Sequence, residues 1–121
     1  MKFTREMPAA ITIKRVSADG IQIGDDLHTH PFALTGEAVL GNWIQKTVEE
    51  LEPADFDEIL ETEPELVLLG TGDRVQFAPR EITFALARRQ VGLEVMDTAA
   101  AARTFNVLVG EGRRVGAVLY V

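Results

Sequence analysis

The stretch Leu66–Pro79, LVLLGTGDRVQFAP, decides the fold. Its first residues, Leu66–Leu69, form a continuous apolar run, which is typical of a β-strand buried on both faces. The run stops at a glycine-rich loop, Gly70–Arg74. Pro79 suits the first turn of a helix, where its missing N–H costs nothing, and the apolar spacing predicts that this helix continues to about Gln90. A buried strand, a loop and a helix in this order indicate an α/β protein.

The same alternation continues to the end of the sequence. Leu93–Met96 predicts a second strand, and Asp97 or Thr98 can cap a helix that runs through four alanines to about Val109. Val115–Tyr120 predicts a last apolar strand. Strands joined by helices imply right-handed crossovers between parallel neighbours, although the last strand can run in either direction. We therefore expect a mixed central sheet.

Short alternating apolar runs mark the N-terminal part of the chain. The runs Ile11–Val16 and Ile21–Ile23 flank Asp19-Gly20, a dipeptide that favours a tight hairpin turn. Residues 29–44 add further short β-like runs and complete an antiparallel meander.

Two further features complete the predicted architecture. Trp43 is expected to pack at the end of the meander, and Ala54–Glu61 has the apolar spacing of a short amphipathic helix. The sequence thus predicts an α/β fold in a single three-layer domain, residues 1–121. In this fold, a central mixed β-sheet has helices on one side and an N-terminal antiparallel β-meander layer.

Composition excludes several classes of function. The 121 residues contain no cysteine, which excludes thiolate metal sites, cysteine-ligated iron–sulfur clusters and a cysteine nucleophile. The net charge of −7 argues against a generic nucleic-acid-binding protein. No apolar run approaches the length of a membrane span, and no secretory signal follows Lys2 and Arg5. We expect a cytoplasmic protein without membrane insertion.

The glycine-rich loop is the candidate site. Ligands of open α/β sheets bind beyond the carboxyl ends of strands, where the loops after the two predicted parallel strands would meet. A helix N-terminus and two arginines nearby would suit a small anionic ligand. The candidate residues are Gly70, Thr71, Gly72, Asp73, Arg74, Arg80, Asp97, Thr98 and Asn106.

Known phosphate-binding motifs do not match this loop. A dinucleotide fingerprint would need a third glycine where Val75 stands, and no Gly-Lys-Ser/Thr sequence is present. The simpler interpretation, which we favour, is that Gly70 and Gly72 only permit a sharp turn. Asn106 likewise has two interpretations. Its amide can face the crevice, or, as we favour, it can bond a backbone carbonyl and fix the helix against the sheet.

The sequence has few residues that suggest a metal site or a catalytic site. His28 and His30 would share one face of a strand, but two histidines without a third are more typical of a surface than of a metal site. Ser17 is the only serine and lies in a predicted turn without a nucleophile motif. The carboxylates of Asp55–Glu61 belong to a helix that should be solvated. We therefore assign no catalytic residue, metal or cofactor, and expect no enzymatic activity.

The order of several segments resembles a known family. PELVLLGTGDRVQFAP (64–79), GLEVMDTAAAARTFNVLVGEGRRVGAVLYV (92–121), ADGIQIG (18–24) and AVLGNW (38–43) are similar to the family that contains mitochondrial complex I assembly factor 3 and the adipogenesis-associated Mth-domain proteins. The resemblance implies a three-layer α/β domain, no accepted enzymatic activity, and function through protein contacts. A non-enzymatic interaction or assembly-factor-like protein with a protein partner is the leading hypothesis. The alternative is a protein that binds a small ligand, an anion or a cofactor at Gly70–Arg74.

Overall fold

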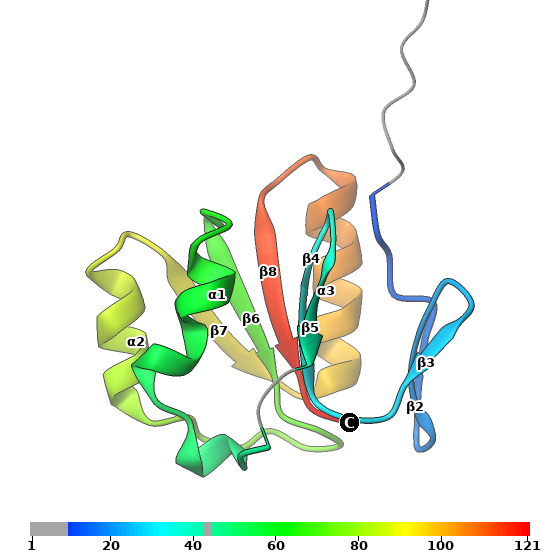
Figure 1. Ribbon diagram of the computed structural model, residues 1–121, viewed down its shortest axis with the longest axis horizontal. Helices are drawn as coiled ribbons and strands as arrows, with labels where there is room; N and C mark the ends of the chain where they lie inside the picture. Colours follow the sequence, from blue (N-terminus) through cyan, green and yellow to red (C-terminus); the bar gives the residue numbers. More distant parts are fainter. Residues whose placement is uncertain (1–9, 43–44) are drawn as a thin grey trace, which may run out of the picture.

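The computed structural model describes residues 10–42 and 45–121 and contains two β-sheets and three α-helices within those ranges (Figure 1). Trp43, which the sequence analysis places at the end of the meander, lies outside the described residues. The strands and helices are β1 (Arg15–Ser17), β2 (Gly20–Ile23), β3 (Asp26–His28), β4 (Phe32–Thr35), β5 (Val39–Asn42), β6 (Leu66–Gly70), β7 (Gly92–Met96), β8 (Val115–Leu119), α1 (Asp57–Leu60), α2 (Arg80–Ala87) and α3 (Thr98–Gly110). Two 3-10 turns, η1 (Val48–Glu50) and η2 (Pro53–Phe56), precede α1.

The central sheet has five strands in the order β5-β4-β8-β6-β7. β6 is parallel to both β7 and β8, whereas β4 is antiparallel to β8 and to β5. The predicted α/β class with a mixed central sheet is therefore confirmed. The direction of the last strand, which the sequence leaves open, is parallel to β6.

The separate antiparallel layer is smaller than the sequence predicts. It consists of β1, β2 and β3 only, because β4 and β5 belong to the central sheet. Phe32, Ala33 and Leu34 in β4 are all buried, so this strand needs cover on both faces, which its place beside β8 provides. The predicted strand at Ile11–Val16 begins only at Arg15, although Lys14 N–H still bonds the Gln22 carbonyl at 2.8 Å.

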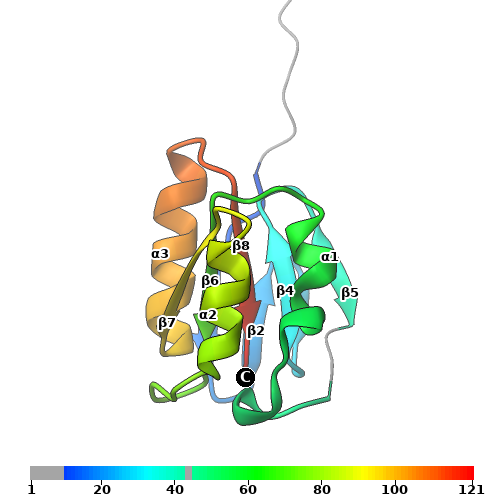
Figure 2. The ribbon, with the colours of Figure 1, turned by 90° about the vertical axis from the view of Figure 1, so that its left-hand side faces the viewer.

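Helices cover both faces of the central sheet, whereas the sequence analysis places them on one side (Figures 1 and 2). Ile59 of α1 lies against Gly116 of β8, and Thr98 of α3 lies against Gly70 of β6. Gly70 pairs with Leu119, three residues from Gly116, so the two helices contact opposite faces. α2 lies on the α1 side, and the β1–β3 sheet lies on the α3 side (Figure 1).

The order of the strands explains this arrangement. The connection from β6 to β7 moves one strand along the sheet, whereas the connection from β7 to β8 moves back across β6. If both crossovers are right-handed, as parallel connections almost always are, a reversal of direction places α2 and α3 on opposite faces.

The core of the molecule is built around β6 and β8. All five residues of β8 are buried, as are Val67, Leu68 and Leu69 of β6. Phe56 and Ile82 are fully buried on the α1 and α2 side, and Phe105 of α3 is fully buried as well. The continuous apolar runs of the sequence thus correspond to strands with cover on both sides.

The helix boundaries are close to the predicted ones. Pro79 is the N-cap of α2, one residue before the first turn, and α2 ends at Ala87 rather than near Gln90. Asp97, and not Thr98, caps α3 by accepting a bond from Ala100 N–H.

We predict that the two central strands unfold last. The backbone amides of Val67–Leu69 and Ala117–Leu119 should exchange with solvent most slowly, because they lie in the middle of the sheet under two covering layers. The amides of β1 and β3, whose residues are mostly exposed, should exchange faster. Hydrogen exchange followed by NMR measures both sets. Equal protection of the two sheets would contradict this view of the core.

Candidate functional site

Three parallel strands end at the same edge of the central sheet. The register pairs Gly70 of β6 with Met96 of β7 on one side and with Leu119 of β8 on the other. The residues that follow each strand therefore start from neighbouring points. Thr71 N–H donates to the Met96 carbonyl at 2.9 Å, and Tyr120 N–H donates to the Gly70 carbonyl at 2.9 Å. The structure places the glycine loop and the Asp97-Thr98 turn side by side.

Thr98 connects these three strand ends. Its backbone N–H donates to the Gly72 carbonyl at 2.8 Å, and its hydroxyl accepts from Gly72 N–H at 2.8 Å. The same hydroxyl donates to the Tyr120 carbonyl at 2.7 Å. Thr98 is 2% exposed, so these bonds are largely shielded from water. One side chain thus fixes the loop after β6 relative to the end of β8.

The two glycines of the loop are needed for different structural reasons. A Cβ atom on Gly70 would lie 3.0 Å from both the Cα and the Oγ1 of Thr98, so a side chain would push the two turns apart. Gly72 has a φ of 103°, which residues other than glycine rarely adopt. The space where its Cβ would lie is open, so the backbone conformation alone favours glycine there. These observations agree with the favoured interpretation that the glycines permit a sharp turn.

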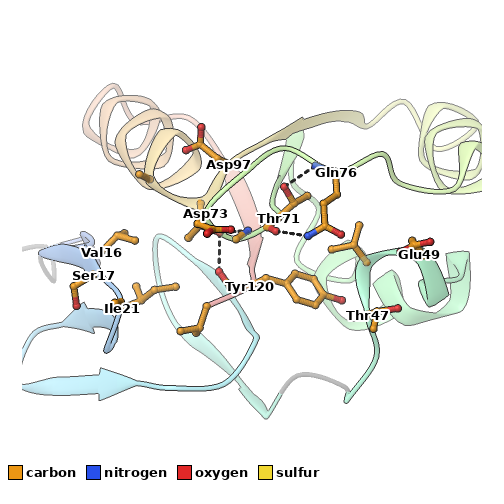
Figure 3. Close-up of a pocket in the computed structure, with 16 residues that line it drawn as sticks. Val16, Ser17, Ile21, Thr47, Glu49, Thr71, Asp73, Gln76, Asp97 and Tyr120 are labelled. Atoms are coloured by element: carbon orange, nitrogen blue, oxygen red, sulfur yellow. Dashed lines mark hydrogen bonds between the residues drawn. The ribbon is translucent and has the colours of Figure 1, made fainter.

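The polar groups of the loop bond mostly to one another. The Thr71 hydroxyl donates to the Arg74 carbonyl at 2.7 Å and accepts from Gln76 N–H at 3.0 Å (Figure 3). The Gln76 side-chain amide donates to the Thr71 carbonyl at 2.9 Å. Thr71 is 1% exposed, so its hydroxyl is committed to holding the loop in shape.

A cavity of about 810 Å³ opens beside these turns. The turns after β6, β7 and β8 form one wall, Val16, Ser17 and Ile21 form a second, and Thr47 and Glu49 of the η1 region form a third (Figure 3). Most of the exposed lining area is apolar, although about half of the lining residues carry polar or charged side chains. A concave site of this size at the carboxyl ends of parallel strands is a typical place for a small molecule.

The charges around this cavity differ from the sequence-based expectation. The charged side chains in its lining are the carboxylates of Glu49, Asp73 and Asp97, and no lysine or arginine is among its lining residues. Arg74 and Arg80 are exposed and lie outside the lining. This lining favours a neutral or cationic group over an anion.

The candidate residues therefore divide into three groups. Those that line the cavity are Thr71, Gly72, Asp73, Asp97 and Thr98. Gly70 is buried beneath the turns, and Arg74, Arg80 and Asn106 lie outside the lining.

Asn106 has a structural partner in the N-terminal segment. Its amide group donates to the Ile13 carbonyl and its amide oxygen accepts from Ile13 N–H, both at 2.8 Å. The side chain thereby pairs with a backbone as a neighbouring strand would. The expected bond to a backbone carbonyl is present, but its partner is Ile13 in the N-terminal segment rather than the central sheet.

Sequence reasoning missed the residues that close the cavity. Val16, Ile21, Thr47 and Glu49 come from segments far from the glycine loop, and Tyr120 is the residue directly after the last strand. No local motif marks these five positions. Only the position of Tyr120 gave a usable signal, because it follows a predicted parallel strand.

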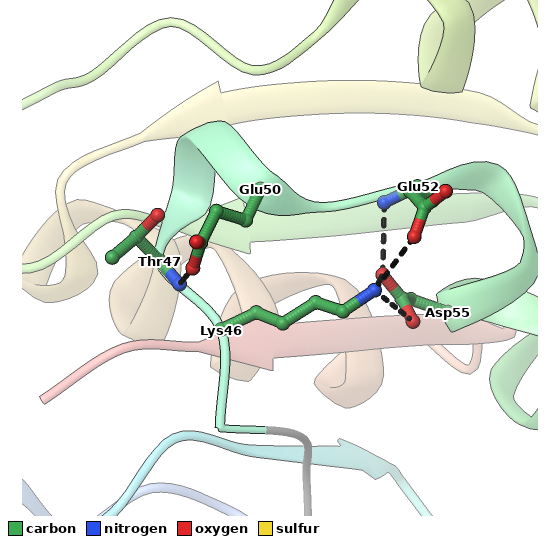
Figure 4. Close-up of polar contacts among 5 residues, drawn as sticks. All are labelled: Lys46, Thr47, Glu50, Glu52 and Asp55. Atoms are coloured by element: carbon green, nitrogen blue, oxygen red, sulfur yellow. Dashed lines mark hydrogen bonds and ion pairs between the residues drawn. The ribbon is translucent and has the colours of Figure 1, made fainter.

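Ion pairs hold the η1 wall in place (Figure 4). Lys46 Nζ lies 2.9 Å from Glu52 Oε1 and 2.9 Å from Asp55 Oδ2. The hydrogen bond from Lys46 to Glu52, followed by the bond to Asp55, raises the pKa of Lys46. Glu50 accepts from Thr47 N–H at 3.0 Å, and this backbone bond is the main reason that the pKa of Glu50 is lowered.

The histidine pair is not part of this site. The His28 ring stacks on Phe32 with 4.4 Å between ring centres. Residues 10–42 and 45–121 contain no group of three or more histidine, aspartate or glutamate side chains that could hold a metal ion.

We predict that Thr98→Val destabilises the protein although the side chain keeps its shape. The Gly72 N–H and the Tyr120 carbonyl would each lose a partner, at about 1–3 kcal/mol per group, so the free energy of unfolding should fall by about 2–4 kcal/mol. Thr104→Val is the matched control in α3, because the Thr104 hydroxyl bonds the carbonyl of Ala100 in its own helix. Urea denaturation measures both variants, and equal effects would contradict the bridging role of Thr98.

Comparison with known proteins identifies relatives over nearly the whole chain. NADH dehydrogenase (ubiquinone) 1 alpha subcomplex assembly factor 3 of Bos taurus is 33% identical over 117 residues, which are 95% of this chain and 63% of the relative. The chain thus spans less than two thirds of the length of that relative. The 13 kDa major membrane protein of Francisella tularensis subsp. holarctica is 31% identical over 101 residues, which are 82% of this chain and 80% of that protein.

Solved structures share the fold. The NMR structure of a Xanthomonas campestris protein is 33% identical, has a TM-score of 0.86, and is matched over 100% of this chain and 92% of that chain. A Bordetella pertussis protein, described as a Mth938-like domain, is 26% identical with a TM-score of 0.80, over 99% of this chain and 92% of that chain.

A family model gives the assignment. The model for the protein family of unknown function DUF498/DUF598 matches residues 13–120. Together with the similarity to assembly factor 3, this match confirms the resemblance seen in the sequence. The chain therefore belongs to the DUF498/DUF598 family.

Proposed function

We propose that residues 1–121 act as one domain with an assembly-factor-like role, through contacts with protein partners and without catalysis. The observation that carries the proposal is the 33% identity, along 95% of the chain, to proteins named as assembly factor 3 of a respiratory NADH dehydrogenase. The partner class that follows is a subunit or intermediate of such a complex.

The state of the site's hydroxyl groups supports a role without catalysis. The hydroxyls of Thr71 and Thr98 are buried and donate to backbone carbonyls, so neither is held next to a base that would activate it as a nucleophile. Asp97 uses one carboxylate oxygen to cap α3. These groups maintain the shape of the strand ends.

We propose the cytoplasm as the compartment. Among the described residues, no helix is both long and apolar enough to span a bilayer. The Francisella relative is nevertheless named as a major membrane protein, so we propose that this chain works beside a membrane, as an assembly factor for a membrane complex must.

We predict that deletion of the gene in its own organism lowers the amount of assembled NADH dehydrogenase. Native gel electrophoresis of membranes and NADH oxidation by those membranes measure the effect. Complementation with the wild-type chain should restore both readouts, and the level of succinate dehydrogenase should stay constant as a control for general respiratory damage. An unchanged amount of assembled NADH dehydrogenase in the deletion strain would refute this function.

The cavity supports a second candidate function, the binding of a small molecule. Its volume of about 810 Å³ and its position at the carboxyl ends of β6, β7 and β8 favour this alternative. Because Glu49, Asp73 and Asp97 line it, the ligand class that we propose is a neutral or cationic molecule with an apolar body. The anionic ligand suggested by the sequence remains an untested prediction.

We predict that a panel of hydrophobic amines raises the melting temperature, whereas inorganic phosphate does not. A ligand at about 100 times its Kd should stabilise the fold by about 2.7 kcal/mol, which a thermal-shift assay detects. Asp73→Asn should reduce the shift, because Asp73 is exposed at the cavity and has no structural bond among those described. Flat melting curves with the whole panel would remove this candidate, and a shift with phosphate alone would support the anion instead.

A further inference from the structure

The loop before α2 and the helix itself expose apolar side chains to solvent. Phe77 is 94% exposed, Val75 is 57% exposed and Phe84 is 57% exposed. They lie within ten residues of one another in the chain, in the loop after β6 and the first turns of α2. Apolar surface of this size in water has a free-energy cost, and such clusters commonly mark binding surfaces.

The same stretch is basic, although the whole chain is acidic. Residues 74–89 contain the exposed arginines Arg74, Arg80, Arg88 and Arg89 and a single acidic residue, Glu81, while the net charge of the chain is −7. Positive charge is thus concentrated beside the exposed aromatic rings. This combination differs from an ordinary solvated helix, where charges of both signs alternate.

Helical spacing places two of the arginines and Phe84 on one face of α2. Arg80, Phe84 and Arg88 follow one another at intervals of four residues and therefore lie in a row along the helix. Ile82 and Leu86, both fully buried, lie on the opposite side against the sheet. The row faces away from the protein, with Phe84 between two arginines and the exposed Glu81 beside it at a spacing of three residues.

α2 projects further from the central sheet than its neighbour α1 (Figure 1). Exposed acidic residues of α1 include Asp57 and Glu58. A surface that approaches the outer side of α2 meets that helix before it meets α1 (Figure 1). At an ionic strength of about 0.15 M, charges more than about 8 Å away are largely screened.

We propose that the outer side of α2 and the residue that leads into it, the α2 surface (Phe77, Arg80, Phe84 and Arg88), dock on the headgroup region of an anionic lipid bilayer. The guanidinium groups bond lipid phosphates, and the rings of Phe77 and Phe84 enter the boundary between headgroups and acyl chains. Each arginine near such a surface adds attraction, and the aromatic rings lose their contact with water.

A bilayer fits this surface better than a folded protein partner. A protein would need a pocket matched to Phe77, whereas the headgroup region of a fluid bilayer adapts to any projecting ring. Charge complementarity points the same way, since a row of arginines matches the repeated phosphates of anionic lipids. The contact would hold the chain at a membrane without a spanning helix, which goes beyond the proposed assembly role and does not depend on it.

Vesicle co-sedimentation tests the proposal with the full chain. Wild-type protein should bind phosphatidylcholine vesicles that contain about 30% phosphatidylglycerol and should not bind pure phosphatidylcholine vesicles. Phe77→Ala should weaken binding roughly tenfold, as expected for one aromatic ring that stays in water. The double variant R80Q/R88Q should weaken it further and remove most of its salt dependence.

Val107→Ala is the matched control. Val107 is 59% exposed, like Phe84, but belongs to α3 on the other face of the sheet, so this variant should bind as the wild type does. Circular dichroism verifies that the variants remain folded, which the exposure of the replaced side chains favours.

Three results would overturn the proposal: no binding of the wild type to the anionic vesicles, equal binding of Phe77→Ala and the wild type, or an equal loss with Val107→Ala. If Phe77→Ala binds vesicles normally but fails to restore NADH dehydrogenase in the deletion strain, the surface belongs to a protein partner instead. An unchanged NADH dehydrogenase level in the deletion strain, with normal vesicle binding, would refute the assembly role and leave the lipid surface intact.

Discussion

The hydroxyl group of Thr98 holds together the ends of three parallel strands. It accepts from Gly72 and donates to the Tyr120 carbonyl, while the Thr98 backbone bonds Gly72 in return. This arrangement requires a glycine at position 70, because any side chain there would strike Thr98. The start of α3, the path of the loop and the floor of the cavity all follow from these bonds. The glycine loop therefore serves structure first, and the space beside it is a consequence of the way the strand ends are joined.

Much of the C-terminal half could be predicted from local patterns. Leu66–Leu69 and Val115–Tyr120 are continuous apolar runs, which allow only strands with cover on both faces. The adjacency of the glycine loop and Asp97-Thr98 followed from one rule on where parallel strands end. The side of the sheet that each helix covers could not be predicted, because it depends on strand order. That order places β8 between β4 and β6, a long-range choice with no local signal.

The N-terminal half and the cavity walls show the limits of sequence patterns more clearly. The runs at β2 and β4 have similar apolar residues, yet only β4 pairs with the central sheet, because β8 offers it a buried partner. Ile13 is apolar and was expected in a strand, but its backbone is satisfied by the Asn106 amide. Glu49 and Thr47 reach the cavity only because η1 folds beneath the strand ends. Each of these contacts joins residues far apart in the chain.

The position of β8 has a consequence for biosynthesis. β8 is the last strand in chain order but occupies the middle of the central sheet, between β4 and β6. While the ribosome is still making the C-terminal residues, the β4–β5 hairpin and the β6–β7 unit have no strand in common. Neither half can bury both faces, so both remain open to chaperones and proteases until β8 has been made and can pair with β4 and β6. Native structure then forms in one step after β8 is made, and a chain truncated before β8 would lack the strand that joins the β4–β5 hairpin to the β6–β7 unit.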